Sequence, residues 1–189
     1  MSSATTVVPF PAGHRVFVYG SLRPDINASI HQRFMGKCIP VGPAYYQGRM
    51  YIVDKRTEEE QLLGLKETTD VSVPSEVRKY PAVVPSDDPA ERVHGMLFDV
   101  PDEHRDEVLR GLDEYEDAVG IPEGLAEYRR DRVTVRMGQG HVHENVEVES
   151  WMYVWAREVH TLARVHDGDY RSVYVLRADA EESASLPQA

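Results

Sequence analysis

Two short stretches of the sequence carry groups that could do chemistry. The first, HRVFVYGSLRPD at 14–25, is an apolar, β-branched run that ends in Gly20 and Ser21. Such a strand end is either an ordinary turn or a cradle whose backbone N–H groups contact a ligand. The second is LDEYED, in which Glu116 follows Leu112 by four positions. Because residues four apart share a helix face, Glu116 lies on the apolar side of a predicted helix.

A carboxylate on an apolar face is costly unless it is paired or hydrogen-bonded, and Glu116 therefore allows two interpretations. In one, it pairs with an arginine of the segment EYRRDRV at 127–133 or lies at a fraying helix end. In the other, it is a general acid/base whose affinity for protons is raised by burial. The residues alone leave both interpretations open.

The elements that must position these groups are mostly strands. Period-2 patterns and apolar runs predict strands at 16–19, 41–53, 80–84, 92–100, 126–137 and 146–155, with helices at 26–36 and 101–117. The last strand is apolar on both faces, which is typical of a packed sheet or closed barrel. We therefore expect an α+β protein with a small mixed β-barrel or strongly curved sheet and flanking helices.

The length and composition favour a single domain. The chain has 189 residues, of which 41% are hydrophobic and 28% charged. A Ser, Thr and Pro-containing leader at 1–13 and a small, acidic tail at 176–189 are expected to be flexible. The domain then spans 14–175, and its charged segment at 54–79 reads as an insertion.

Charge and cysteine content argue against several classes of protein. The net charge is −11, and no Lys/Arg cluster stands out, so neither a nucleic acid nor an anionic membrane surface is expected as a partner. No apolar run approaches the length of a membrane span. Cys38 is the single cysteine and the start of the chain lacks the features of a secretory signal, which together predict a cytoplasmic location.

Five motifs, taken in order, resemble those of the gamma-glutamyl cyclotransferase-like family, which includes gamma-glutamylamine cyclotransferases and plant avirulence-induced-gene-like proteins. They are VFVYGSLR, YPAVVP, VHGMLFDV, LDEYED and EYRRDRVTV, and they span residues 16 to about 156. One departure concerns the helix end, where the family usually follows its glutamate with glycine and this chain has Asp117. A second acid there is expected to raise the affinity of Glu116 for a proton further.

The resemblance implies an enzyme that cyclises a small gamma-glutamyl amine or amide to 5-oxoproline and releases the amine. It implies Glu116 as the general acid/base, with no metal, cofactor or catalytic serine, and it does not fix the oligomeric state. The substrate-binding residues that it implies are Tyr19, Gly20, Ser21, Leu22 and Tyr128. For Tyr128, a packed phenol remains an equal alternative.

Other interpretations remain open at this point. The chain could be a non-catalytic member of the fold that binds a small metabolite or a protein, or it could transfer the acyl group to an external amine. His141 and His143 could share a strand face and bind zinc, but two ligands make an incomplete site and we expect no metal. Arg23 could attract a substrate carboxylate, although arginines at loop starts are more often solvated. Tyr80 is expected in the core or at the rim.

Overall fold

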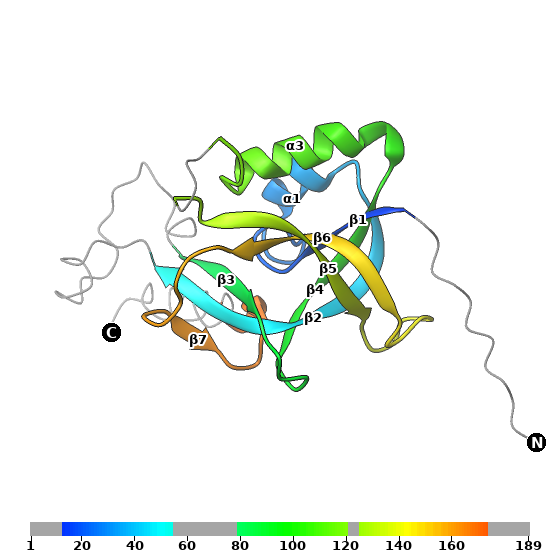
Figure 1. Ribbon diagram of the computed structural model, residues 1–189. Coiled ribbons are helices and arrows are strands. Elements are labelled where there is room, and N and C mark those ends of the chain that lie inside the picture. Colours follow the sequence, from blue (N-terminus) through cyan, green and yellow to red (C-terminus); the bar gives the residue numbers. More distant parts are fainter. Residues whose placement is uncertain (1–12, 55–78, 121–124, 174–189) are drawn as a thin grey trace, which may run out of the picture.

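The computed structural model describes residues 13–54, 79–120 and 125–173 (Figure 1). Its strands are β1 His14–Val18, β2 Ile39–Asp54, β3 Lys79–Pro85, β4 Arg92–Val100, β5 Tyr128–Met137, β6 Glu147–Trp155 and β7 Ala163–Val165. Its helices are α1 Ala28–Met35, the 3₁₀ turn η2 Asp102–His104 and α3 Arg105–Tyr115. The predicted tail, and nearly all of the predicted leader and insertion, lie outside the described residues.

Five of the strands close into a barrel. Neighbouring strands follow the order β2, β4, β1, β6 and β5, and β5 pairs back with β2. β1 and β6 run parallel, whereas the other pairs around the barrel are antiparallel. The sequence-based expectation of a small mixed barrel is therefore confirmed.

The long strand β2 belongs to the barrel in its first part and leaves it in its second. Its residues 39–47 pair with β4, with a register shift between Pro40 and Gly42, and its residues 48–54 pair with β3. The short strand β7 pairs with β2 at Met50–Ile52. β7 was not expected from the sequence, so the described residues contain seven strands and not the six that the pattern predicted.

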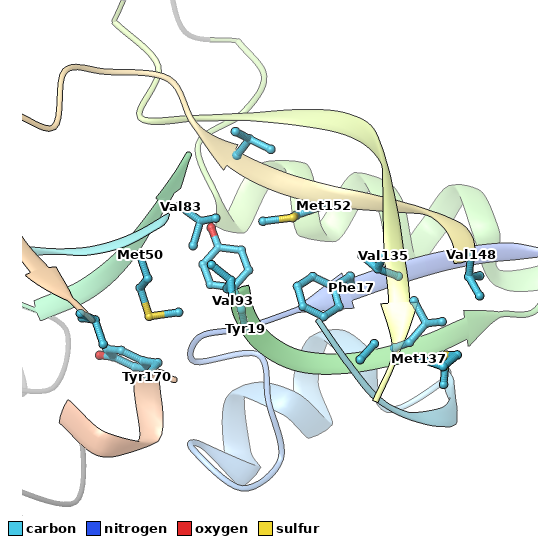
Figure 2. Packing of buried hydrophobic residues seen from close by; sticks show 14 of the residues in the cluster. Phe17, Tyr19, Met50, Val83, Val93, Val135, Met137, Val148, Met152 and Tyr170 are labelled. Atoms are coloured by element: carbon cyan, nitrogen blue, oxygen red, sulfur yellow. The ribbon is translucent and has the colours of Figure 1, made fainter. Parts of the chain in front are cut away.

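Alternating residues of β1 separate two hydrophobic clusters. Phe17, and Tyr19 just beyond the end of β1, belong to the cluster inside the barrel, which Figure 2 shows from close by. In that view Met50 and Tyr170 lie at one end of the row of side chains, and Val148 lies at the other. Val16 and Val18 belong to the second cluster, which includes buried residues of both helices. Apolar residues on both faces thus reflect a sheet that is covered on both sides.

α1 and α3 lie together on one side of the barrel (Figure 1). Asn27 caps the start of α1, and its side chain accepts a hydrogen bond from the N–H of Ile30 at 3.0 Å. The rings of Phe34 and Tyr115 connect the two helices, with centroids 4.6 Å apart. None of the helices in the described parts of the chain is long and apolar enough to cross a lipid bilayer.

Candidate active site

A cavity of about 420 Å³ lies where the end of β1 meets the end of α3. Its other walls come from the starts of β3 and β5, from β6, and from the segment that follows β7. The structure places all the sequence-predicted site residues on this one cavity: Tyr19, Gly20, Ser21, Leu22, Glu116 and Tyr128. The turn and the helix end, which are about 95 residues apart in the chain, therefore face a common space.

Glu116 is held by the way in which α3 ends. The N–H of Ala118 donates to the carbonyl of Asp113 at 2.9 Å, and the N–H of Asp117 donates to the carbonyl of Glu114 at 3.4 Å. These two bonds form a Schellman motif, which requires a residue with positive φ just after the cap. Asp117 is that residue, with a φ of 49°. The need for a positive φ explains why the family usually has glycine at this position. In this chain Asp117 adopts the same left-handed conformation.

The carboxyl of Glu116 has no hydrogen-bond or ion-pair partner among the described residues, in contrast to the expected pairing with an arginine, although the residue does lie at the end of α3. Arg130, one of the arginines in the segment 127–133, instead pairs with Asp113 at 3.1 Å. Burial raises the pKa of Glu116 to about 8, and the negative charge of Asp117 adds to the rise. A group with this pKa can both accept and donate a proton near neutral pH.

The turn after β1 presents a row of backbone donors. The N–H of Arg23 donates to the carbonyl of Gly20 at 2.9 Å, whereas the N–H groups of Gly20, Ser21 and Leu22 have no backbone acceptor within the described residues. A ring nitrogen of His31 donates to the carbonyl of Leu22, with Nδ1 and the oxygen 2.7 Å apart. This hydrogen bond from α1 holds the turn in position. The three backbone N–H groups of the turn can contact an anionic or carbonyl oxygen.

Packing gives a reason for glycine at position 20. A Cβ added there would lie 2.8 Å from Cγ of Pro81, on the wall formed by β3. The hydroxyl of Ser21 is hydrogen-bonded to that of Tyr115 at 2.9 Å, so it holds the turn against α3. A contact with a ligand is therefore not needed to explain this serine.

Six tyrosines line the cavity, and each hydroxyl has a protein partner. Tyr115 pairs with Ser21 as described, and the other five donate to carbonyl or carboxylate oxygens: Tyr19 to Tyr153 O (2.6 Å), Tyr80 to Glu127 (2.6 Å), Tyr128 to Pro81 O (2.8 Å), Tyr153 to Asp113 (2.8 Å) and Tyr170 to Lys79 O (2.9 Å). Burial raises the pKa of Tyr19, Tyr128 and Tyr153, so these phenols stay protonated. Since their protons are committed to protein acceptors, their oxygens can act only as acceptors toward a ligand.

Tyr128 is a packed phenol at the cavity wall, and its role in binding a substrate stays a prediction. Its side chain is buried and packs against Trp155, as a structural phenol would, and it also lines the cavity. Tyr80 lies at the rim as expected, half-buried and bonded to Glu127.

The expectation that Arg23 is solvated is wrong. Arg23 is 3% exposed and forms ion pairs with Asp25 at 2.5 Å and Asp169 at 3.3 Å. The segment after β7 carries Asp169 and, next to it, Tyr170 on the cavity wall. A buried arginine thus ties the turn after β1 to the segment that completes the cavity.

Sequence reasoning assigned no role to several cavity residues that the structure brings together. Tyr153 lies in the strand predicted at 146–155 and Tyr115 in the helix predicted at 101–117, and neither stood out from its pattern as a site residue. Glu127 and Tyr170 gave no signal, since each depends on contacts far along the chain. Asp113 does carry a signal, because it precedes Glu116 by three positions and so shares its helix face.

The described part of the chain contains no group of three or more His, Cys, Asp or Glu side chains that could hold a metal ion. The rings of His141 and His143 are near each other, with centroids 5.6 Å apart, in the connection between β5 and β6. Burial raises the pKa of the Cys38 thiol to about 11, which disfavours the thiolate that nucleophilic chemistry requires.

A comparison with known families shows to which of them the chain belongs. The profile of the family described as gamma-glutamyl cyclotransferase, AIG2-like, matches residues 16–172. The chain belongs to this family. No curated protein sequence matches the chain significantly.

Solved structures share the fold at low sequence identity. A mouse (Mus musculus) AIG2-like protein is 16% identical, with a TM-score of 0.50 over 81% of this chain and 86% of its own. YkqA from Bacillus subtilis is 14% identical, with a TM-score of 0.52 over 89% of this chain and 43% of its own. Kluyveromyces lactis allophanate hydrolase is 9% identical, with a TM-score of 0.51 over 88% of this chain and 22% of its own. The fold therefore occurs both alone and within longer chains.

Proposed function

We propose that this protein is a gamma-glutamyl cyclotransferase that converts a gamma-glutamyl amine or amide to 5-oxoproline and a free amine. The observation that carries the proposal is the Glu116 carboxyl, which faces the cavity without a partner among the described residues and has a pKa of about 8. Family membership supports the same reaction type. The reaction needs neither a metal nor a cofactor, because the substrate contains both nucleophile and electrophile.

The bond changes balance within one substrate molecule. The α-nitrogen attacks the γ-carbonyl carbon, a new C–N bond closes the five-membered ring, and the bond to the leaving nitrogen breaks. The α-ammonium loses two protons in the process, and the leaving nitrogen gains two. Glu116 would carry these protons from one nitrogen to the other. Because the pKa of Glu116 lies far above that of an ordinary carboxyl, its carboxylate is a stronger base toward an α-ammonium group and its protonated form still donates near neutral pH.

The turn after β1 would stabilise negative charge. As the ring closes, the carbonyl oxygen becomes an oxyanion, and fixed N–H donors contribute most to catalysis when they point at such an oxygen. The N–H groups of Gly20, Ser21 and Leu22 would serve either that oxygen or the α-carboxylate. Tyr19 and Tyr128 would line the pocket that holds the glutamyl part. Alignment of the two reacting atoms would make the larger contribution to the rate acceleration, since effective molarities for internal attack reach about 10⁵ to 10⁸ M.

The test is an assay of 5-oxoproline release by mass spectrometry across gamma-glutamyl amines and dipeptides. Wild-type protein should form the lactam from at least one of them, and Glu116→Gln should lower turnover about 10²- to 10⁴-fold. Glu114→Gln is the matched control, because Glu114 is an exposed carboxyl on the same helix.

Three outcomes would contradict the proposal in different ways. Unchanged turnover in Glu116→Gln would remove this residue from the mechanism. A linear acyl product on an external amine would show an amidotransferase-like reaction. Binding of a gamma-glutamyl compound without any product would show a non-catalytic member of the fold.

A further inference from the structure

Asp117 brings a negative charge to the wall of the cavity. It follows Glu116 at the end of α3, and both residues line the cavity. Asp117 is exposed, and its carboxylate forms no ion pair or side-chain hydrogen bond with the residues that the structure describes. Because the family usually has glycine at this position, this charge is a feature of the present chain and not of the shared site.

The other permanently charged side chains on the cavity wall have opposite charges beside them. Nζ of Lys79 lies 3.8 Å from the carboxylate of Asp54. The carboxylate of Glu127 lies 3.4 Å from the guanidinium of Arg157. Within the described parts of the chain, the charge that remains uncompensated on this wall is therefore the negative charge of Asp117.

The position of Asp117 relates it to one end of a substrate. In the proposed reaction Glu116 protonates the leaving nitrogen, so this nitrogen lies beside the Glu116 carboxyl. The substituent on the leaving nitrogen is not part of the new ring and extends away from it. Asp117 is the more exposed of the two neighbouring acids on the cavity wall. The substituent therefore reaches toward solvent along the side of the cavity that carries Asp117.

On the basis of the proposed function, we propose that Asp117 selects gamma-glutamyl amides whose leaving amine carries a second positive charge. The preferred leaving group is then an alkyl diamine or a similar cation, and an amine that ends in a carboxylate is disfavoured. Asp117 does not touch the reacting atoms and acts only on the far end of the leaving group. An attraction between exposed opposite charges changes a rate or binding constant by up to about fivefold and is weakened by salt.

The test compares three amides of the glutamate γ-carboxyl that differ only at the far end of the leaving group. They are made from 1,4-diaminobutane, pentylamine and 5-aminopentanoate, so that chains of equal length end in an ammonium, a methyl or a carboxylate group. Release of 5-oxoproline by wild-type protein should give the highest kcat/KM for the ammonium amide and the lowest for the carboxylate amide. Each step should amount to about two- to fivefold at low salt and shrink at high salt.

Two variants of Asp117 test whether this residue causes the order. Asp117→Asn keeps the shape of the side chain and tolerates the left-handed backbone, and Asp117→Gly restores the residue that is usual in the family. In both variants the three kcat/KM values should lie within about twofold of one another. A change in the pKa of Glu116 affects all three amides alike and cancels in their ratios. Glu114→Gln is the matched control and should keep the wild-type order, because Glu114 is an exposed acid of α3 outside the cavity lining.

Equal kcat/KM values for the three amides in the wild type would overturn this inference. An unchanged order in both variants of Asp117 would also overturn it, because the preference would then come from another charge, such as that of Glu127.

Failure of the proposed function gives a different result, because none of the amides would then yield 5-oxoproline. Titration calorimetry with Glu116→Gln decides the inference in that case as well. The ammonium amide should bind more tightly than the methyl amide, and adding Asp117→Asn should abolish the difference. Equal affinities for the two amides in Glu116→Gln would overturn the role of Asp117 independently of any turnover.

Discussion

Asp117 follows Glu116 directly and affects it in two independent ways. Its backbone has a φ of 49°, in the region that favours glycine, and it completes the motif that ends α3. Its charge adds to the effect of burial and raises the pKa of Glu116. One residue thus fixes the position of the candidate acid/base and shifts its protonation.

Replacement of Asp117 should separate the two effects. Asp117→Asn and Asp117→Gly both remove the charge, so in each the pKa of Glu116 should fall below about 8. Because a general base acts when deprotonated, the rise of kcat/KM with pH should move to lower pH in both variants. Only Asp117→Gly also relieves the left-handed backbone, and it should raise the free energy of unfolding by about 0.5–1 kcal/mol. An unmoved pH profile in both variants would show that this charge does not reach Glu116.

Glu116 should make the stability of the protein depend on pH. Its pKa is about 8 in the folded protein, against an ordinary value of 4.5, so the folded state holds a proton that the unfolded chain has lost between these values. This contribution to stability is complete below about pH 4.5 and is lost as the pH rises toward 8, with a slope of at most about 1.4 kcal/mol per unit. Glu116→Gln is neutral throughout and should gain stability over the wild type as the pH rises.

Urea unfolding of wild type and Glu116→Gln from pH 5 to pH 9 measures this difference. The gap between the two proteins should widen with pH up to about 8 and then stay level. Glu114→Gln, which changes an exposed carboxyl on the same helix, should show no such widening. A constant gap between wild type and Glu116→Gln would mean that burial does not raise the pKa of Glu116.

Gly20 should tolerate a side chain only if the side chain of Pro81, on the opposite wall of the cavity, is made smaller. In Gly20→Ala the new Cβ would lie 2.8 Å from Cγ of Pro81, and either the turn or β3 must move. We expect a loss of about 1–3 kcal/mol in the free energy of unfolding, as for other overpacked sites, together with lower kcat/KM. Pro81→Ala removes the atoms that clash, so the double variant should lose less stability than the sum of the single changes. Additive losses in denaturant unfolding would argue against this contact.

Much of the fold could be predicted because its strands carry strong local patterns. The run at 92–100 was expected as a strand and is β4, Arg92–Val100. β7 was missed because Ala163–Val165 has three residues, of which only Val165 is buried, and this is too short for any period. The position of β7 is set by its pairing with β2, and no local sequence pattern encodes that contact.

The candidate site was predictable only where a local rule applied. Glu116 follows from its spacing to Leu112 on one helix, and the turn at Gly20 follows from the end of an apolar run. Tyr153 and Arg130 gave no such signal, because their link to Asp113 depends on how α3 lies against β5 and β6. The expectation for Arg23 was wrong for the same reason, because its partner Asp169 lies 146 residues further along the chain.

The ion pair between Arg23 and Asp169 should affect substrate binding as well as stability. Asp169→Asn keeps a side chain that can accept the N–H of Arg171, which Asp169 accepts at 3.0 Å, but it removes the charge opposite a buried arginine. We expect a loss of about 1–3 kcal/mol in the free energy of unfolding and a higher KM, because Tyr170 beside it lines the cavity. Urea unfolding and steady-state kinetics on the same preparation measure both quantities.

A second arginine pair provides the control for this prediction. Arg15 is also buried and pairs with Asp99 at 2.8 Å, and neither residue lines the cavity. Asp99→Asn should therefore lower stability in the same direction and leave KM unchanged. A rise in KM in both variants would show that general loosening of the fold, and not the link between the turn after β1 and Tyr170, weakens substrate binding.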